Sequence, residues 1–185
     1  GVGDPNSKSL GIVVFDFNSD GWPDIFVAND TQPNKLYRNN RNGTFTELGL
    51  KAGLAFSEEG RARAGMGVDA VDLDNTGRPA VVVTNFSGEM LGLYTPLGDG
   101  QYIDRAPRSD VGRATRQTLG WGCFFFDVDL DGRQDLLVVN GHLDAALARV
   151  DRQVRYAETP HLFLNTGGRF EDIARQAGDA FSLPK

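Results

Sequence analysis

DVDLDGRQD, residues 127–135, is the stretch of this 185-residue chain that decides its fold. Asp127, Asp129, Asp131 and Asp135 take the first, third, fifth and ninth positions, and a glycine takes the sixth. Carboxylates this close together repel one another, so something must offset the cost. Oxygen donors at alternate positions of a tight, glycine-turned loop suit a hard cation, and calcium accepts about six to eight oxygens in irregular geometry. The stretch therefore predicts a calcium loop.

The same pattern occurs three times along the chain. DFNSDGWPD stands at 16–24 and DLDNTGRPA at 72–80, so the three loops begin 56 and then 55 residues apart. A glycine and a short apolar run precede each loop, and a second apolar run and a Leu-aromatic pair follow it. Short runs rich in Val, Ile and Phe are typical of strands.

Each repeat therefore predicts four short antiparallel strands, which is the pattern of a β-propeller blade. We expect an all-β fold of about three blades, near 8–56, 65–110 and 119–178, within one repeat region, 1–185. A β-sandwich is the alternative. Three blades leave two open edges. We therefore expect a piece of a ring of about 6–8 blades, completed by further blades of a longer chain or by a second copy.

The third repeat carries an insertion at 141–161, between its second and third strands. Apolar residues recur in it with helical spacing and predict one short amphipathic helix. They are Leu143, Leu147, Val150 and Val154.

Arginines gather in two connections that we expect on the face opposite the acidic loops. One interpretation is that this face binds an anionic partner, such as an acidic polysaccharide or a protein carboxylate. The other is that the arginines pair with the chain's own Asp and Glu. The residues are Arg105, Arg108, Arg113 and Arg116 in one connection, and Arg149, Arg152 and Arg155 in the insertion.

The acidic loops are not EF-hands, because the twelfth position is Val27, Val83 or Val138 within an expected strand, where an EF-hand needs Glu. The ninth-position aspartate would close the site, and the seventh residue would offer its carbonyl oxygen. We expect two calcium sites, the third loop binding more tightly than the first, and a doubtful site in the second loop. The alternative is a solvated turn whose aspartates cap their own backbone. The candidate ligands are Asp127, Asp129, Asp131, Arg133 and Asp135 in the third loop, Asp16, Asn18, Asp20, Trp22 and Asp24 in the first, and Asp72, Asp74 and Thr76 in the second.

Composition excludes several classes of function. A net charge of −6 disfavours nucleic-acid binding. No apolar run reaches the roughly 20 residues of a membrane span. A single cysteine, Cys123, excludes an intrachain disulfide, and we expect it to be a buried, inert thiol. We expect His142 and His161 to be hydrogen-bonded structural residues, and no nucleophile-elbow or zinc-protease motif is present.

The repeats as a whole resemble a known family. FVANDTQPNKLYRN at 26–39, AGMGVDAVDLDNTG at 64–77, LGWGCFFFDVDLDG at 119–132 and LFLNTGGRFEDIARQAG at 162–178 carry the resemblance. The chain is similar to the FG-GAP/VCBS repeat propellers, which include the integrin α-subunit head, and within them to proteins with an ASPIC/UnbV domain after the repeats.

This resemblance implies a non-catalytic, calcium-binding module for cell adhesion or ligand binding. It implies an extracellular, cell-surface or periplasmic location and a protein or carbohydrate ligand. The alternative is the calcium-stabilised propeller portion of a secreted polysaccharide-active enzyme. Such an enzyme would need clustered Tyr, His, Lys or carboxylates at the ring centre.

Overall fold

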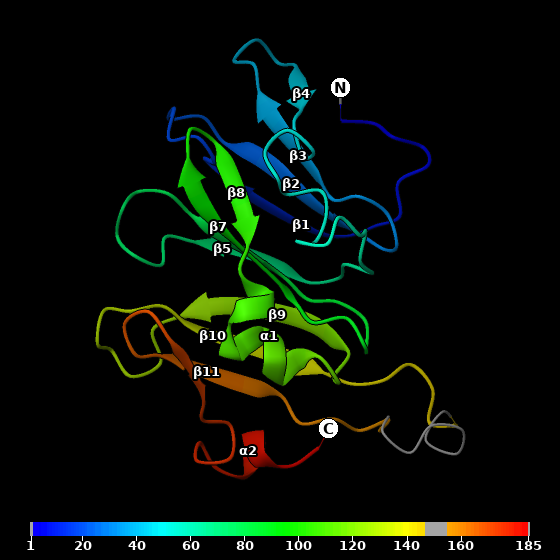
Figure 1. Ribbon diagram of the computed structural model, residues 1–185, viewed down its shortest axis with the longest axis vertical. Helices are drawn as coiled ribbons and strands as arrows, with labels where there is room; N and C mark the ends of the chain where they lie inside the picture. The colour runs from blue at the N-terminus through cyan, green and yellow to red at the C-terminus, as the bar shows by residue number, and fades with distance from the viewer. Residues whose placement is uncertain (1, 147–154, 185) are drawn as a thin grey trace.

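The computed structural model of the chain describes residues 2–146 and 155–184, and these form an all-β fold (Figure 1). Twelve strands make three antiparallel sheets of four, each in sequence order, as the repeats predict. The described strands form no closed sheet. The first sheet holds β1 (Ser9–Phe15), β2 (Asp24–Asn29), β3 (Lys35–Asn39) and β4 (Phe45–Glu47). The second holds β5 (Val68–Val71), β6 (Ala80–Val83), β7 (Gly92–Gly98) and β8 (Gln101–Asp104). The third holds β9 (Gly120–Phe126), β10 (Asp135–Asn140), β11 (His161–Asn165) and β12 (Phe170–Asp172).

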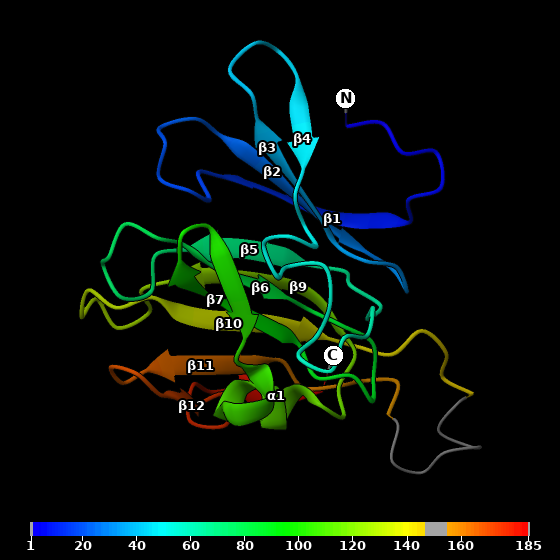
Figure 2. The same cartoon turned by 45° about the horizontal axis from the view of Figure 1, so that its top comes forward.

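The three sheets, here called units 1, 2 and 3, stack face to face (Figures 1 and 2). Phe26 and Leu36 of unit 1 meet Val81, Val83 and Tyr94 of unit 2 in one core. The opposite face of unit 2 packs against unit 3 in a second core, so all four residues of β6 are buried. Burying a large apolar side chain contributes about 1.5–3 kcal/mol, so these two cores hold the units together.

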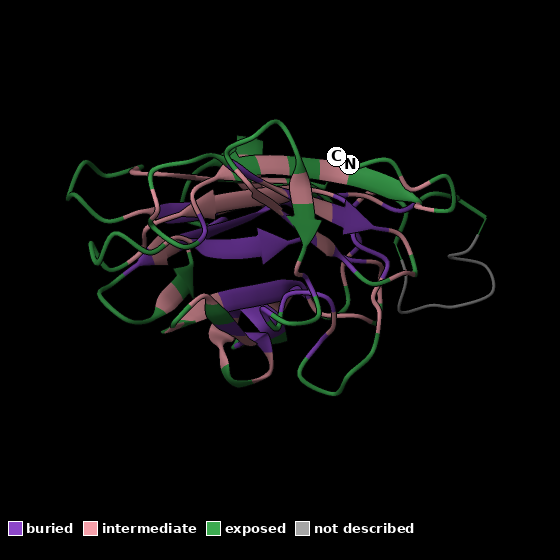
Figure 3. Cartoon of the chain, turned by 90° about the horizontal axis from the view of Figure 1, so that it is seen from above, coloured by how far each residue is buried: buried purple, intermediate pink, exposed green. Residues whose placement is uncertain are grey.

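The outward faces of units 1 and 3 have no such partner. Leu10, Ile12 and Val14 of β1 are 58–64% exposed, and Phe124 of β9 and Val139 of β10 are 44–46% exposed. Buried residues therefore concentrate in the central strands, while loops and outer strands are exposed (Figure 3). Alternation of side chains along a strand explains this, because one face of each outer sheet is in a core and the other is not.

The innermost strands of neighbouring units approach very closely at glycines. A Cβ on Gly11 would lie 2.1 Å from the carbonyl oxygen of Met66, and one on Gly67 would lie 2.2 Å from that of Trp121. Only glycine permits such an approach. Gly122 holds the same position in unit 3, and a Cβ there would meet nothing within 4 Å.

In the described part of the chain, three short helices lie outside the sheets: η1 (Ala106–Arg108), α1 (Asp110–Thr115) and α2 (Asp179–Ser182). Helix α1 lies beside β12 (Figure 2), and the Ser109 side chain caps its start by accepting the Gly112 N–H. Most of the helix predicted from Leu143 to Val154 lies outside the described residues. No described helix is long and apolar enough to cross a membrane.

The expected single arginine-rich face is divided. Arg105, Arg108 and Arg113 line a cleft between units 2 and 3 together with Asp74 of the second acidic loop. Arg116 lines a different cleft. The prediction that all four lie opposite the acidic loops is therefore wrong, because η1 and α1 fold the chain back along the unit boundary.

Candidate metal centres

The three acidic loops, 16–24, 72–80 and 127–135, join the first and second strands of their units and lie on the same side of the molecule, at the left in Figure 1. They share one backbone conformation. In each, the fourth and sixth residues have positive φ, which L side chains rarely adopt and glycine adopts readily. The φ values are 56°, 56° and 60° at Ser19, Asn75 and Leu130, and 83°, 78° and 87° at Gly21, Gly77 and Gly132.

The first aspartate of each loop holds this turn. Its carboxylate accepts the N–H of the fifth residue at 3.0–3.1 Å and that of the sixth at 2.6–2.8 Å. Aspartates that bond their own backbone favour tight turns without any ion. The shared backbone therefore follows from the first aspartate and the glycine, and it does not by itself require a metal.

The ninth-position aspartates, Asp24 and Asp135, are fully buried and join the loop to the third strand of the sheet. Asp135 accepts the N–H groups of Val128 at 2.8 Å and Asn165 at 2.7 Å. Asp24 accepts the two corresponding N–H groups of unit 1 at 3.2 and 2.7 Å. Each of these aspartates thus satisfies one backbone donor of its own loop and one of the third strand, 15 or 30 residues away in sequence.

The second unit lacks both groups of the contact between the ninth-position carboxylate and the backbone N–H of the third strand. Ala80 takes the ninth position, and Pro96 of β7 takes the place that Asn39 has in β3 and Asn165 in β11. Proline has no N–H, so the missing carboxylate leaves no donor unsatisfied there. The second loop therefore keeps its shape without a ninth-position carboxylate.

The third loop brings three carboxylates together. One oxygen from each of Asp127, Asp129 and Asp135 lies within 4.8 Å of the others. Asp129 is exposed and accepts no hydrogen bond from any described residue, so only solvent offsets the repulsion from the two neighbouring carboxylates. Asp131, also a predicted ligand, lies outside this cluster and pairs with the guanidinium of Arg133.

In the first loop, an arginine likewise engages the fifth-position carboxylate. Asp20 pairs with Arg41 at 3.0 Å and accepts the Asn18 amide at 3.1 Å. Desolvation works in the other direction, but these contacts hold the pKa of Asp20 below its usual value. Among the described residues, the first loop forms no three-carboxylate cluster like that of the third.

In the first loop, the buried carboxylate of Asp24 would favour a nearby positive charge. Burial raises the pKa of Asp24, and the nearby charges of Asp20 and Asp16 raise it further, against the two backbone hydrogen bonds that lower it. A raised carboxyl pKa means that the charged form is disfavoured, and a bound cation would favour it again.

The donors fit a hard cation such as calcium, because they are oxygens without nitrogen or sulfur ligands. In the second loop, Thr76 donates its hydroxyl to Asp74 at 2.7 Å, and no ninth-position carboxylate is present. Coordination by the backbone carbonyls of Trp22 and Arg133 stays a prediction. The residues that would hold an ion are Asp127, Asp129 and Asp135 in the third loop and Asp16, Asn18, Asp20 and Asp24 in the first.

Asn39 and Asn165, whose N–H groups bond the ninth-position aspartates, were not among the residues predicted from the sequence. A signal for them exists in the repeats. Leu-aromatic-x-Asn occurs at 36–39 and 162–165, whereas 93–96 ends in proline. Arg41, which engages Asp20 from the next turn, has no such signal.

The remaining reactive side chains have structural surroundings. His161 stacks on Phe163, its Nδ1 lies 2.6 Å from Asp172 Oδ2, and its Nε2 lies 3.3 Å from the Thr118 hydroxyl. The ring of His142 packs edge-on against Phe86, although its buried Nδ1 has no hydrogen-bond partner among the described residues.

Cys123 packs beside the core between units 2 and 3. Burial raises the pKa of its thiol to about 12, so it is protonated at neutral pH and a poor nucleophile.

The stacked sheets and the repeated acidic loops define a repeat protein with propeller-like blades. Comparison with known protein families agrees with this class. Residues 16–83 and 72–138 each match the FG-GAP-like repeat, and together they cover about two thirds of the chain. The chain belongs to the FG-GAP-like repeat family. A search of curated proteins found no match for this chain.

Proposed function

We propose that this chain is a calcium-binding, non-catalytic repeat module that serves as an extracellular adhesion or ligand-binding scaffold. The observation that carries the proposal is the cluster of Asp127, Asp129 and Asp135, together with the lack of any hydrogen-bond donor to Asp129 within residues 2–146 and 155–184. Turn formation explains the first aspartate and the glycine, but it gives no reason for an uncompensated carboxylate at the third position. A divalent ion gives that reason and would join β9 to β10.

The proposed extracellular location is supported by the calcium affinity expected of such loops. Sites with only a few carboxylate ligands, such as the three clustered in the third loop, belong with the weaker calcium sites, which fill only where calcium is abundant, as outside cells. The non-catalytic role is supported by the surroundings of the candidate nucleophile and bases. The Cys123 thiol is protonated, and His161 lies between Asp172 and Thr118.

The exposed apolar faces of units 1 and 3 support a further part of the proposal. Ile12 and Phe124 lie on faces that correspond to the buried faces of unit 2. We expect each face to pack against another repeat of the same kind, in a longer chain or in a second copy, so that the three units form part of a ring.

Thermal unfolding with and without calcium tests the metal proposal. At about 100 times the dissociation constant, a bound ion stabilises the folded state by about 2.7 kcal/mol, which raises the melting temperature by about 5–10 °C for a chain of this size. Asp129→Asn should remove most of this rise and should change the melting temperature in chelator by no more than about 1 °C, because Asp129 makes no protein hydrogen bond.

Asp74→Asn, at the same position of the second loop, is the matched control and should leave the calcium-induced rise unchanged. An unchanged melting temperature on adding millimolar calcium to the wild-type chain would refute the metal proposal. So would an undiminished rise in Asp129→Asn.

A further inference from the structure

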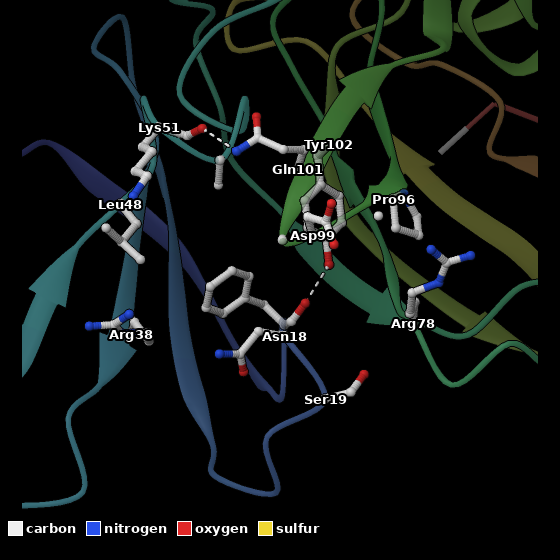
Figure 4. A pocket seen from close by; sticks show the side chains of 14 residues that line it. Asn18, Ser19, Arg38, Leu48, Lys51, Arg78, Pro96, Asp99, Gln101 and Tyr102 are labelled. Atoms are coloured by element: carbon white, nitrogen blue, oxygen red, sulfur yellow. Dashed lines mark hydrogen bonds between the residues drawn. The ribbon is translucent and has the colours of Figure 1, made fainter.

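A cleft between units 1 and 2 opens on the side of the acidic loops and encloses about 400 Å³ (Figure 4). The first acidic loop forms one wall through 17–19, and the β7–β8 turn forms the other through 96–102. Arg38 and Arg78 lie on opposite sides of the cleft in Figure 4. A cleft of this volume accommodates a ligand the size of a small oligosaccharide unit.

Hydrogen bonds across the unit boundary hold the walls of this cleft in place. Tyr102 donates its hydroxyl to the carbonyl of Phe17 at 3.3 Å, and the Gln101 amide donates to the carbonyl of Lys51 at 2.9 Å. Ser19 donates to the carbonyl of Gly77 at 3.0 Å and so ties the first acidic loop to the second. The cleft is therefore largely preformed, which lowers the entropy cost of binding.

Three cations line the cleft: Arg38, Lys51 and Arg78. None of them forms an ion pair with a carboxylate anywhere in residues 2–146 and 155–184. The one acidic residue in the described lining is Asp99. The cleft thus carries an excess of positive charge in a protein whose net charge is −6.

The equivalent cleft between units 2 and 3 is arranged differently. It encloses about 640 Å³, and four arginines line it. Three of the four have carboxylate partners: Arg108 pairs with Glu58, and Arg113 and Arg169 both pair with Asp110. At one boundary, most of the cleft's arginines are therefore engaged in ion pairs, whereas the cations of the cleft between units 1 and 2 have no such partner among the described residues.

We propose that the cleft between units 1 and 2 binds an acidic oligosaccharide, with its carboxylate or sulfate groups on Arg38, Arg78 and Lys51. Guanidinium groups bind such oxygens through paired, charge-assisted hydrogen bonds. The Ser19 hydroxyl oxygen and the Gln101 side-chain carbonyl oxygen can still accept hydrogen bonds from sugar hydroxyls. The cations come from two units, which suits an anion whose charges are spread along it. This inference rests on the proposed role as a ligand-binding scaffold.

Calorimetric titration in calcium tests the inference, with trigalacturonate and a sulfated uronate disaccharide as probes. The wild-type chain should bind at least one of them. Arg38→Gln and Arg78→Gln should each weaken that binding about tenfold, the loss expected for one charge-assisted contact. Arg113→Gln, in the equivalent cleft, is the matched control and should stay within twofold of wild type. Neutral maltotriose should not bind.

Three results would overturn the inference: no binding of either acidic sugar, an equal loss in Arg113→Gln, or triglutamate binding as tightly as the sugars. The last result would indicate an acidic peptide ligand instead. Melting in calcium and in chelator, run on the same samples, keeps the two proposals apart. A normal calcium-induced rise without sugar binding would reject this inference alone, and matching melting temperatures would show that the variants fold.

Discussion

The second and third acidic loops have the same backbone but different side chains. Asn75 and Leu130 have φ values of 56° and 60° at the fourth position, and Gly77 and Gly132 have 78° and 87° at the sixth. At the ninth position, however, the third loop has a buried carboxylate and the second has Ala80. The turn and the charge are therefore separable properties of the repeat, carried by different positions.

In the second unit, the buried carboxylate and the third-strand N–H that would bond it are both missing. In unit 3, Asp135 satisfies the N–H of Asn165, whereas in unit 2 Pro96 offers no N–H to satisfy. Either change alone would leave a buried group without a partner, which costs about 1–3 kcal/mol. The two differences therefore have to be considered as a pair.

Replacing Asp135 by alanine, the residue at the same position of the second loop, should have the largest effect on stability. Asp135→Ala leaves the buried N–H of Asn165 and the partly buried N–H of Val128 without an acceptor, so the free energy of unfolding should fall by about 2–6 kcal/mol. Urea unfolding should show this loss in chelator as well as in calcium. Asp135→Asn, which keeps one acceptor oxygen, should lose less. A variant that loses stability only in calcium would contradict the structural part of this argument.

The reverse exchange in the second loop should give an intermediate effect. Ala80→Asp alone buries a carboxylate with too few donors and should cost about 1–3 kcal/mol. Pro96→Asn should recover part of that loss by supplying the missing N–H, so a double-mutant cycle should give a favourable coupling of about 1 kcal/mol or more. A coupling near zero, measured by urea unfolding of the four chains, would mean that Ala80 and Pro96 differ from the other units independently.

The smallest effect concerns the first loop, where Arg41 competes with any ion for Asp20. Arg41→Gln should raise the calcium affinity of that loop by up to about fivefold, since exposed ion pairs contribute about 0.2–1 kcal/mol. Calorimetry at low salt in an Asp129→Asn background would isolate this loop. Arg61→Gln, in the cleft that Arg116 lines, provides the control. A lower calcium affinity in Arg41→Gln would show that the arginine helps to hold the loop for the ion.

Much of the fold could be predicted because its information is local and repeated. A glycine, an apolar run and an acidic loop recur at nearly equal spacing, and alternation within the runs specifies strands. Helix α1 escaped prediction because its six residues, Asp110–Thr115, give too short a pattern. Its stability comes from the Ser109 cap and from packing of Val111 between units, and neither is visible in a window of sequence.

The candidate sites were predicted less completely, for a related reason. The spacing of Asp127, Asp129 and Asp135 identifies a cluster within nine residues, and the structure brings these three together. Asp131 and Asp20 share that spacing, yet each pairs with an arginine. Asp131 is engaged by Arg133 of its own loop, and Asp20 by Arg41 of another turn, so the spacing of the carboxylates alone does not show which of them stay available. The positive cleft depends in the same way on side chains from two units.

At the glycines of the innermost strands, the cost of a substitution depends on whether a neighbouring unit is present. Alanine at Gly11 or Gly67 would place a methyl group about 2 Å from a backbone oxygen of the next unit, which cannot move aside. Substitution at these two sites is therefore costly because the neighbouring unit is part of this chain. Gly122 has open space around it, and alanine there costs this chain little. In an assembly where another repeat packs against β9, the same methyl group would clash with that repeat. The loss of stability caused by alanine at Gly122 would therefore show whether a further unit is present.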